Sequence, residues 1–392
     1  MSKPRNRRLK ELLEEQPQLL GIYAVKASKV ECNLAIGQPE MDPPEELHSS
    51  ICNLINQAGY AGYVSAIGSA AARQAVADYF KSLGIGDGSI KQVAITNGAR
   101  SMISYVLMTL CCPGNRVLWF GPGYTYADTA KLLQLNPILI PNKPIKFSPD
   151  LELLKIELNM AEKFKQLSVL VINNPVNPTG RVWSRQELES VAKIISDYNI
   201  FVIADETYAG LVFDDAEFVP FATIEGMAER TITVGSGSKS LRIPGYRLGF
   251  VHGPEEFIKA LAVVISNMAG CPNVFALLAT QELCHNLQHT QKQLPALLRK
   301  RQLIINWCCE HSLELTPPQG AFYSFINFKS VLKRKGLNDT KELADILLEK
   351  GVGITPSQAF GQCYGNWARI SYAGPENILV KGLQIIGEYI SN

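Results

Sequence analysis

Short runs of apolar, often β-branched residues alternate with helical patterns of apolar positions between about residues 90 and 250. This alternation is typical of parallel strands joined by crossover helices. One such helix is expected after Ser184, because Ser184 and Glu187 have the spacing of a capping box and the next apolar residues share one helical face. The expected strands are Gln92–Thr96, Arg116–Phe120, Pro137–Pro141, Val169–Asn173, Phe201–Ala204, Thr231–Val234 and Gly249–His252. The pattern predicts an α/β fold with a mostly parallel, seven-stranded sheet and flanking helices.

The pattern changes after about residue 285 and predicts a smaller α+β domain. A long helix should run through Lys300 and Trp307, and the early segment Cys32–Ile36 is expected to pair with this domain. The other expected elements are a strand at Ala321–Phe328, a helix at Thr340–Lys350 and a strand at Ala368–Tyr372. We therefore expect an N-terminal segment at 1–48 that packs with the small domain, a large ligand-binding domain at 49–285 and the small domain at 286–392.

Composition narrows the possible partners. The 392 residues are 46% hydrophobic and 19% charged, with a formal net charge of +2, which fits a globular protein and gives no reason to expect nucleic acid or membrane binding. The basic cluster from Arg5 to Lys10 is followed by acidic residues and predicts a solvated terminal helix. Neither a long apolar span nor a signal peptide is found, so a cytoplasmic location is expected.

Cysteine and histidine spacing does not indicate disulfides or a metal. The nine cysteines include two adjacent pairs and no C-x-x-C motif, so we expect reduced and mostly buried thiols. His285 and His289 have helical spacing, but no carboxylate follows in a zinc-protease pattern, so no metal is expected there.

Lys239 is the first candidate for chemistry. It lies three residues after Ser236 and eight before Arg247 in a glycine-containing stretch. A lysine whose pKa is lowered by burial and nearby positive charge can capture a carbonyl, and the other two residues can bind phosphate oxygens. This grouping indicates pyridoxal phosphate, an aldehyde cofactor held through an imine. The alternative is a surface lysine and arginine beside a turn.

Asp205 and Asn177 come at the ends of two apolar strands, where α/β sheets collect ligands. Asp205 could pair with a protonated pyridine nitrogen, while Asn177 and Tyr208 could donate to the phenolic oxygen of the same ring. Alternatively, Asp205 caps the following turn and the Pro-rich loop around Asn177 only makes a turn.

Five further residues are candidates for ligand binding. Gly98, Ala99 and Arg100 stand at an expected helix start, where free amides attract phosphate, although a plain strand-to-helix turn looks similar. Tyr124 could stack on a planar cofactor or be an ordinary core aromatic. Arg369, on an apolar strand, needs an anion, either a substrate carboxylate or an internal Asp or Glu.

These motifs, in their order and spacing, resemble the class I/II aminotransferases of the aspartate aminotransferase superfamily, the fold type I pyridoxal-phosphate enzymes. Asn177, Asp205, Lys239, Arg247 and Arg369 follow one another at 28, 34, 8 and 122 positions. The resemblance spans about residues 30–385. Its most specific parts are Asn-Pro-x-Asn-Pro-Thr-Gly, Asp-x-x-Tyr and Ser-x-Ser-Lys with the following Gly-x-Arg-x-Gly.

The resemblance implies a role for each matched residue. Lys239 would form the Schiff base and move the proton, Asp205 would partner the ring nitrogen, and Asn177 and Tyr208 would donate to the phenolate. The remaining implied roles are phosphate binding by Gly98, Ala99, Ser236 and Arg247 with Arg100 nearby, ring stacking by Tyr124, substrate carboxylate binding by Arg369, closure over substrate at Gly37, and contact with the neighbouring subunit's phosphate by Tyr63. A homodimer with composite sites is also implied.

The expected reaction is amino-group transfer from an L-amino acid to a 2-oxo acid by a ping-pong mechanism. The nearest alternatives keep the cofactor and change the outcome, as in a C–S β-lyase or an aminocyclopropane-carboxylate synthase. A regulatory relative with a DNA-binding domain is not expected, because only about 30 residues precede the first motif. A generic nucleotide-binding protein is not expected either, because no glycine-rich phosphate loop follows the early strands.

Overall fold

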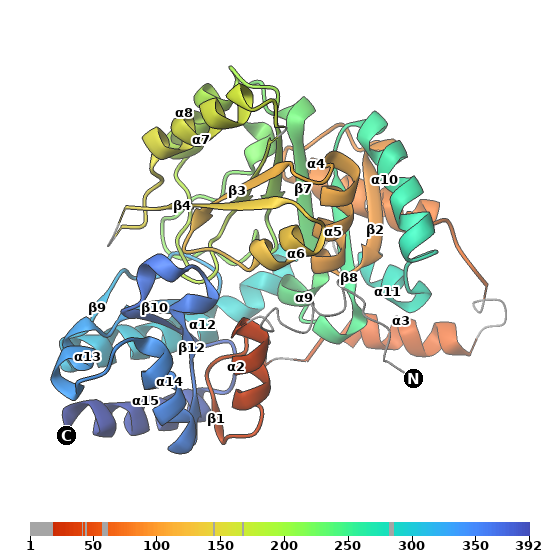
Figure 1. The fold of residues 1–392 in the computed structure, drawn as a ribbon. Helices are drawn as coiled ribbons and strands as arrows, with labels where there is room; N and C mark the ends of the chain where they lie inside the picture. Colours follow the sequence, from red (N-terminus) through yellow and green to blue (C-terminus); the bar gives the residue numbers. More distant parts are fainter. Residues whose placement is uncertain are drawn as a thin grey trace, which may run out of the picture.

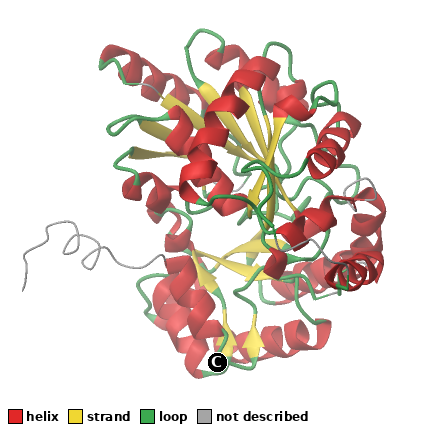
Figure 2. Cartoon of the chain, turned by 90° about the vertical axis from the view of Figure 1, so that its right-hand side faces the viewer, coloured by secondary structure: helices red, strands yellow, loops and turns green. Residues whose placement is uncertain are grey.

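A seven-stranded sheet forms the centre of the larger part of the molecule (Figures 1 and 2). The computed structural model describes residues 19–40, 42–43, 45–56, 62–143, 146–166, 168–281 and 286–392. The strands run in the order β2-β8-β7-β6-β5-β3-β4, and β8 is antiparallel to both of its neighbours while the other pairs are parallel. Their bounds are β2 Val93–Asn97, β3 Arg116–Gly121, β4 Asn136–Pro141, β5 Ser168–Asn173, β6 Phe201–Asp205, β7 Thr231–Ser236 and β8 Leu248–His252. The predicted α/β fold with a mostly parallel sheet is confirmed.

Alternate residues of the central strands β3, β5 and β6 serve two separate cores, which explains why these strands read as continuous apolar runs. In β5, Val169 and Val171 face one core, and Leu170 and Ile172 face the other. Helices α5 (Ala99–Leu110) and α10 (Glu255–Met268) cover the first face, and α7 (Leu151–Lys163) and α8 (Arg185–Ile195) cover the second. The sheet is therefore buried between two helical layers.

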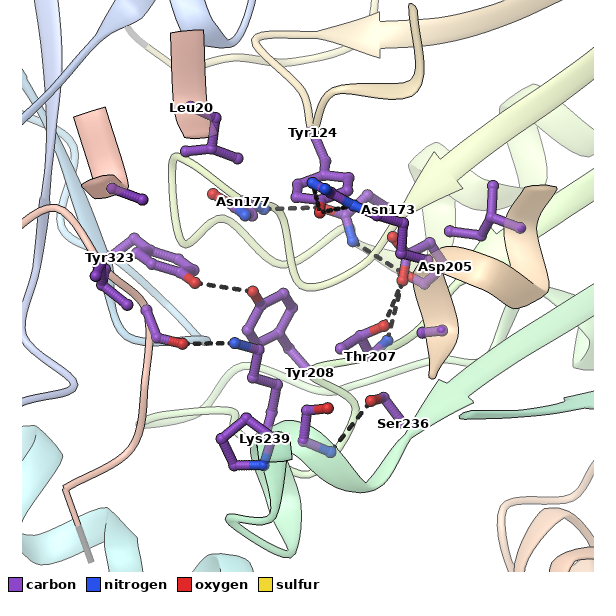
Figure 3. Close-up of a pocket in the computed structure, with 18 of the residues that line it drawn as sticks. Leu20, Tyr124, Asn173, Asn177, Asp205, Thr207, Tyr208, Ser236, Lys239 and Tyr323 are labelled. Atoms are coloured by element: carbon purple, nitrogen blue, oxygen red, sulfur yellow. Dashed lines mark hydrogen bonds between the residues drawn. The ribbon is translucent and has the colours of Figure 1, made fainter. Parts of the chain in front are cut away.

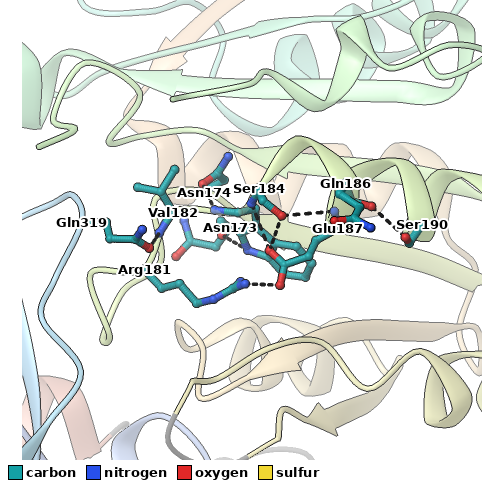
Figure 4. A network of polar contacts seen from close by, with 10 residues as sticks. Asn173, Asn174, Arg181, Val182, Ser184, Gln186, Glu187, Ser190 and Gln319 are labelled. Atoms are coloured by element: carbon teal, nitrogen blue, oxygen red, sulfur yellow. Dashed lines mark hydrogen bonds and ion pairs between the residues drawn. The ribbon is translucent and has the colours of Figure 1, made fainter. Parts of the chain in front are cut away.

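The predicted start of α8 is confirmed, and it joins a polar network beside the sheet (Figure 4). Ser184 and Glu187 form the reciprocal bonds of a capping box, and Arg181 forms an ion pair with Glu187. In the same network Asn174 Oδ1 accepts the backbone N–H of Trp183 at 3.1 Å. The loop after β5 is thereby tied to the first turn of α8.

A second core holds the C-terminal elements together with the N-terminal segment. Strand β1 (Cys32–Asn33) pairs in parallel with β11 (Val352–Gly353), and buried Cys32 and Leu34 belong to the C-terminal core. The four-stranded sheet has the order β12-β13-β10-β9, with β9 Glu314–Leu315, β10 Tyr323–Asn327, β12 Thr355–Pro356 and β13 Trp367–Ser371. The surrounding helices are α2 Leu19–Ala27, α12 Asn286–Glu310, α13 Lys329–Lys335, α14 Thr340–Glu349 and α15 Glu376–Ser391. The division into 1–48, 49–285 and 286–392 stays a proposal, because Leu47 of α3 (Glu45–Ile55) packs in a core with the large sheet.

The predicted strands are present, and two of them differ from the expected bounds by two residues at one end. Strand β7 continues to Ser236, because its antiparallel pairing with β8 reaches Ser236 opposite Gly249. Strand β10 is shorter than the expected Ala321–Phe328. Ala321 has a φ of 58°, which strand backbone cannot adopt, and Phe328 is the N-cap of α13.

The expectation that the thiols are mostly buried is wrong. The eight cysteines within the described ranges are free, but only Cys32 and Cys308 are buried. Cys111 and Cys309 stand at or near the ends of α5 and α12, where the helices reach the surface. No helix among the described residues has the length and hydropathy needed to cross a membrane. The expected terminal helix at residues 5–15, as well as His285, lies outside the described residues.

Candidate active site

One cavity of about 380 Å³ brings together residues from the edge of the large sheet, the N-terminal segment and the small sheet (Figure 3). Most residues singled out from the sequence line it: Gly37, Ala99, Arg100, Tyr124, Asn177, Asp205, Tyr208, Ser236, Lys239, Arg247 and Arg369. Leu20 and Ala24 of α2 and Ile36 add an apolar wall. The cavity thus gathers positions up to 349 residues apart in the chain.

The directions of the strands explain why these residues lie close together. Asn177, Asp205 and Lys239 follow or end the parallel strands β5, β6 and β7, so they lie at one edge. Strand β2 runs in the same direction and delivers Gly98 there. Strand β8 runs the opposite way, so Arg247, which precedes it, reaches the same edge.

Lys239 projects into the cavity from α9 (Gly237–Ser240), directly after β7. Ser236 begins this short helix by accepting the Ser238 N–H at 3.1 Å. Lys239 Nζ donates to the Gly37 carbonyl at 2.5 Å. Burial, followed by the nearby charges of Arg369 and Arg247, lowers the pKa of Lys239 to about 8. The alternative of a surface lysine is therefore wrong for Lys239, although Arg247 itself is exposed.

Asp205 is a buried carboxylate at the end of β6. Its Oδ2 accepts from the Tyr126 hydroxyl at 2.7 Å, and its Oδ1 accepts from the Thr207 hydroxyl at 2.6 Å and the Thr207 N–H at 3.4 Å. Burial raises the pKa of Asp205, while the bonds from Thr207 and Tyr126 oppose this rise. Asp205 thus makes the turn bond that the alternative interpretation required, and it also lines the cavity.

Asn177 is held by a short relay from the sheet. Its N–H donates to Asn173 Oδ1 at 2.8 Å, and Asn173 Nδ2 donates to the Asp205 carbonyl at 2.9 Å. Asn177 Oδ1 accepts from Arg369 Nη1 at 2.9 Å. Since the side-chain oxygen is engaged by Arg369, the Nδ2 group of Asn177 is the part that can donate to a ligand.

Arg369 is a buried guanidinium on β13. Its Nη2 donates to the Ala35 carbonyl, and its plane lies over the Tyr323 ring at 4.3 Å. No Asp or Glu in the described ranges forms an ion pair with it, so the alternative of an internal acidic partner is wrong there. Its Nε is buried without a hydrogen-bond partner among the described residues. Arg369 therefore has unsatisfied donor capacity and an uncompensated charge beside the cavity.

A second positively charged region lies where the Gly98 backbone comes close to the Arg247 guanidinium. Gly98 has a φ of 100°, and a Cβ there would lie 2.2 Å from Arg247 Nη2. Ala99 begins α5 directly afterwards, so the first amides of this helix face the same region. Arg247 Nη1 donates to the Pro244 carbonyl at 2.8 Å. Glycine at 98 thus leaves room for the guanidinium at a helix N-terminus.

The structure also shows which neighbours the sequence analysis did not assign. Tyr323 Oη lies 2.9 Å from Tyr208 Oη, while Tyr126 and Thr207 hold Asp205. Thr207 could have been noticed, because a threonine two residues after an aspartate suits a local side-chain turn bond. Tyr323 carries no local signal, since it reaches the cavity only when β10 packs against the large sheet.

Tyr124 and Tyr63 occupy different surroundings. Tyr124 lines the cavity, and its hydroxyl accepts from Arg100 Nε at 3.0 Å. Tyr63 lies outside this cavity and is 98% exposed. It lines a separate cavity that also includes Arg247. The described fold therefore presents the Tyr63 side chain to solvent.

Comparison with known proteins agrees with this geometry. The family model described as aminotransferase class I and II matches residues 29–384. An aspartate aminotransferase of Pyrococcus horikoshii is 30% identical, with 92% of this chain and 91% of that protein covered. An aromatic-amino-acid aminotransferase 2 of Thermococcus litoralis is also 30% identical, with 87% of each chain covered.

Solved structures share the fold. The aspartate aminotransferase of Thermus thermophilus with maleate superposes with a TM-score of 0.89 at 24% identity, covering 99% of this chain and all of that one. The aromatic aminotransferase of Pyrococcus horikoshii gives 0.85 at 28% identity, covering 95% of this chain and 98% of that one. With the family match over nearly the whole chain, the protein belongs to the class I and II aminotransferase family.

Proposed function

We propose that the protein uses pyridoxal phosphate to transfer an amino group from an L-amino acid to a 2-oxo acid in a ping-pong reaction. The observation that carries this proposal is the Lys239 amine, whose lowered pKa and placement in one cavity with Asp205 and Arg369 suit carbonyl chemistry. The activities named for the relatives above support the same reaction class.

The donor set fits this cofactor. Asp205 is a buried carboxylate that forms no ion pair with any Lys or Arg among the described residues, so a protonated ring nitrogen would compensate its charge. Asn177 Nδ2 and the Tyr208 hydroxyl would hold the phenolic oxygen. Gly98, Ala99, Ser236 and Arg247, with Arg100 nearby, would hold the phosphate, as helix N-termini and guanidinium groups commonly do. Tyr124 would cover the ring.

Bound in this way, pyridoxal phosphate supplies an aldehyde that combines with amines and an electron-withdrawing ring. Lys239 Nζ supplies the acid–base step: as a free amine it takes the proton from the α-carbon of the amino acid and holds it until it is returned. A pKa of about 8 suits both directions near neutral pH.

Arg369 would bind the α-carboxylate of the substrate. Its charge has no acidic partner among the described residues, and its bonds to Asn177 and Ala35 fix the plane of the guanidinium. A carboxylate would complete this set through two parallel bonds. The α-carbon would thus be oriented from one side by Arg369 while Lys239 approaches from α9, directly after β7.

The deciding experiment compares the wild-type protein with Lys239→Ala under single-turnover conditions, with L-aspartate, L-glutamate and L-phenylalanine as donors. We expect one equivalent of oxo acid per site with no acceptor present, and continued turnover only after 2-oxoglutarate is added. The Lys239→Ala protein should lose at least about a thousandfold in rate and still bind some cofactor. Continued product formation from one amino acid alone would indicate the β-elimination or cyclisation chemistry instead.

We further propose a homodimer in which Tyr63 reaches the neighbouring subunit's site. Its exposed side chain and its position beside Arg247 at the second cavity support this arrangement. A cytoplasmic location stays a prediction from the sequence.

A further inference from the structure

The segment from Leu34 to Glu40 runs beside β13 and the turn that follows it, and is fixed at both ends. At its start, the Leu34 carbonyl accepts the Ser371 N–H at 2.8 Å, and the Ala35 carbonyl accepts from Arg369. At its end, the Glu40 N–H donates to the Ala373 carbonyl at 3.1 Å. The middle of the segment therefore has a defined path across the cavity.

Gly37 stands at this middle and contacts two residues of the site. Its carbonyl accepts from Lys239 Nζ at 2.5 Å, and a Cβ at Gly37 would lie 1.8 Å from Tyr323 Oη. The backbone is thus pressed against the tyrosine that bonds Tyr208. A small displacement of the segment would change the surroundings of the Lys239 amine.

Lys300 of α12 anchors the far end of this segment. Its side chain is only 3% exposed, and its Nζ donates to the Gly374 carbonyl at 2.6 Å and to Glu40 Oε2 at 3.3 Å. Burial lowers the pKa of Lys300, and Glu40 opposes this shift. A buried ammonium is tolerated only where such partners surround it, so its geometry ties Glu40 to the turn after β13.

We propose that Lys300 is a positioning residue, which through Glu40 and Gly374 holds the 34–40 segment so that the Gly37 carbonyl stays against Lys239. The inference rests on the proposed function for the role of Lys239. Lys300 touches neither the cavity nor Lys239, and it acts by fixing a loop whose middle does. The clamp joins three elements that are distant in sequence: the N-terminal segment, α12 and the turn before α15.

The first test measures amide hydrogen exchange in the peptide covering residues 34–40. Lys300→Met removes the charge and keeps an unbranched side chain, leaving the half-exposed Glu40 free to reach water. We expect this peptide to exchange about tenfold faster in Lys300→Met, as for the loss of a charge-assisted hydrogen bond, with the melting temperature unchanged or raised. The control is Lys26→Met. Lys26 also connects the N-terminal segment to the small domain, through an exposed 2.7 Å ion pair with Asp345.

The second test separates positioning from general stability. For the amino acid that reacts best in the single-turnover assay, we expect KM to rise about fivefold to tenfold in Lys300→Met and in Glu40→Gln, with a smaller change in kcat. The double variant should be no worse than the more affected single variant, because both remove one clamp. Lys300→Arg should restore part of the loss.

Unchanged exchange of the 34–40 peptide in Lys300→Met would overturn the inference. So would additive effects of the two single variants, or equal effects in Lys26→Met. The exchange measurement needs no turnover, so failure of the clamp can be distinguished from failure of the proposed amino-group transfer.

Discussion

Lys239 shares its cavity with Arg369 and Arg247, and burial together with the charges of these two residues lowers the pKa of Lys239 to about 8. In the cofactor-free protein we expect reductive methylation of Lys239 by formaldehyde to be half-maximal near pH 8, compared with about 10.4 for an ordinary lysine. At pH 8 this difference corresponds to about a hundredfold larger unprotonated fraction. Peptide mass spectrometry across pH 6–10 measures it, with the other lysine peptides as internal reference. A midpoint above pH 9.5 would contradict the environment described for Lys239.

The lowered pKa of Lys239 also makes the free energy of unfolding depend on pH. Because the folded pKa of Lys239 is below the unfolded value, the unfolded chain binds more protons between about pH 8 and pH 10.4, so this residue's contribution to the unfolding free energy rises with pH across that window. Lys239→Met should remove that part of the pH dependence in denaturant titrations of the cofactor-free protein.

Gly98 is the residue where backbone conformation and ligand binding meet. Gly98→Ala places a Cβ 2.2 Å from Arg247 Nη2 at a φ of 100°, so the guanidinium must move. We expect the Kd for pyridoxal phosphate to rise at least about tenfold, together with about 1–3 kcal/mol of lost stability from backbone strain. Fluorescence titration of the cofactor-free protein measures the first effect and urea unfolding the second.

Gly336→Ala is the matched control for this prediction. Gly336 also has a left-handed φ, of 67°, but a Cβ there meets nothing within 4 Å. It should lose stability without any change in cofactor affinity. If both variants bind the cofactor like the wild type, the Gly98 loop has no part in binding it.

At the scale of elements, strand direction decides which loops share the site. The parallel strands bring Asn177, Asp205 and Lys239 to one edge, and the reversed β8 brings Arg247 there from its amino end. The loop after β5 depends in turn on the start of α8, through the network of Arg181, Ser184 and Glu187. Helix capping and the position of the Asn177 loop are thus physically linked.

Ser184→Ala tests how much this helix start contributes. Loss of the N-cap bond should lower the unfolding free energy by about 1 kcal/mol, because the Glu187 N–H loses its side-chain acceptor and the Glu187 carboxylate loses the bond from the Ser184 hydroxyl. Urea titration measures the change. Ser190→Ala on the same helix removes only a bond to the Gln186 carbonyl and should change stability by less than about 0.5 kcal/mol. Equal losses in the two variants would show that the capping box contributes no more to the free energy of unfolding than the Ser190 hydrogen bond.

At the scale of the whole molecule, the cavity lies where two cores meet, and a second subunit is proposed to complete it. Sedimentation should show a dimer, and Tyr63→Phe should weaken activity with the fold unchanged, since the side chain is 98% exposed. A mixture of Lys239→Ala and Tyr63→Phe chains, refolded together, should be more active than the two variants refolded separately and then combined. In a mixed dimer, one site receives Lys239 from one chain and Tyr63 from the other.

Absence of this complementation, with a dimer present, would show that Tyr63 does not act across subunits. A monomer in sedimentation would show that the site is formed within one chain. Both results are independent of the Lys300 test, which concerns contacts within a single chain.

The sequence by itself determined the strands, the capped helix and most of the residues that line the cavity. Apolar alternation, capping spacing and strand-end motifs are local signals, and they fix which residues form each element. Element ends were less well determined, as for β7, because pairing with β8 extended it. The buried state of the cysteines was also misjudged, because exposure depends on which helix face is covered.

Only the tertiary structure decided the contacts between distant segments. Tyr323 beside Tyr208, the Gly37 carbonyl on Lys239, and Lys300 clamped to Glu40 join positions 115, 202 and 260 residues apart. No local pattern encodes such pairs, because they arise when the small sheet and the N-terminal segment pack against the edge of the large sheet. Local propensity selected the elements, and burial of their apolar faces decided which side chains meet.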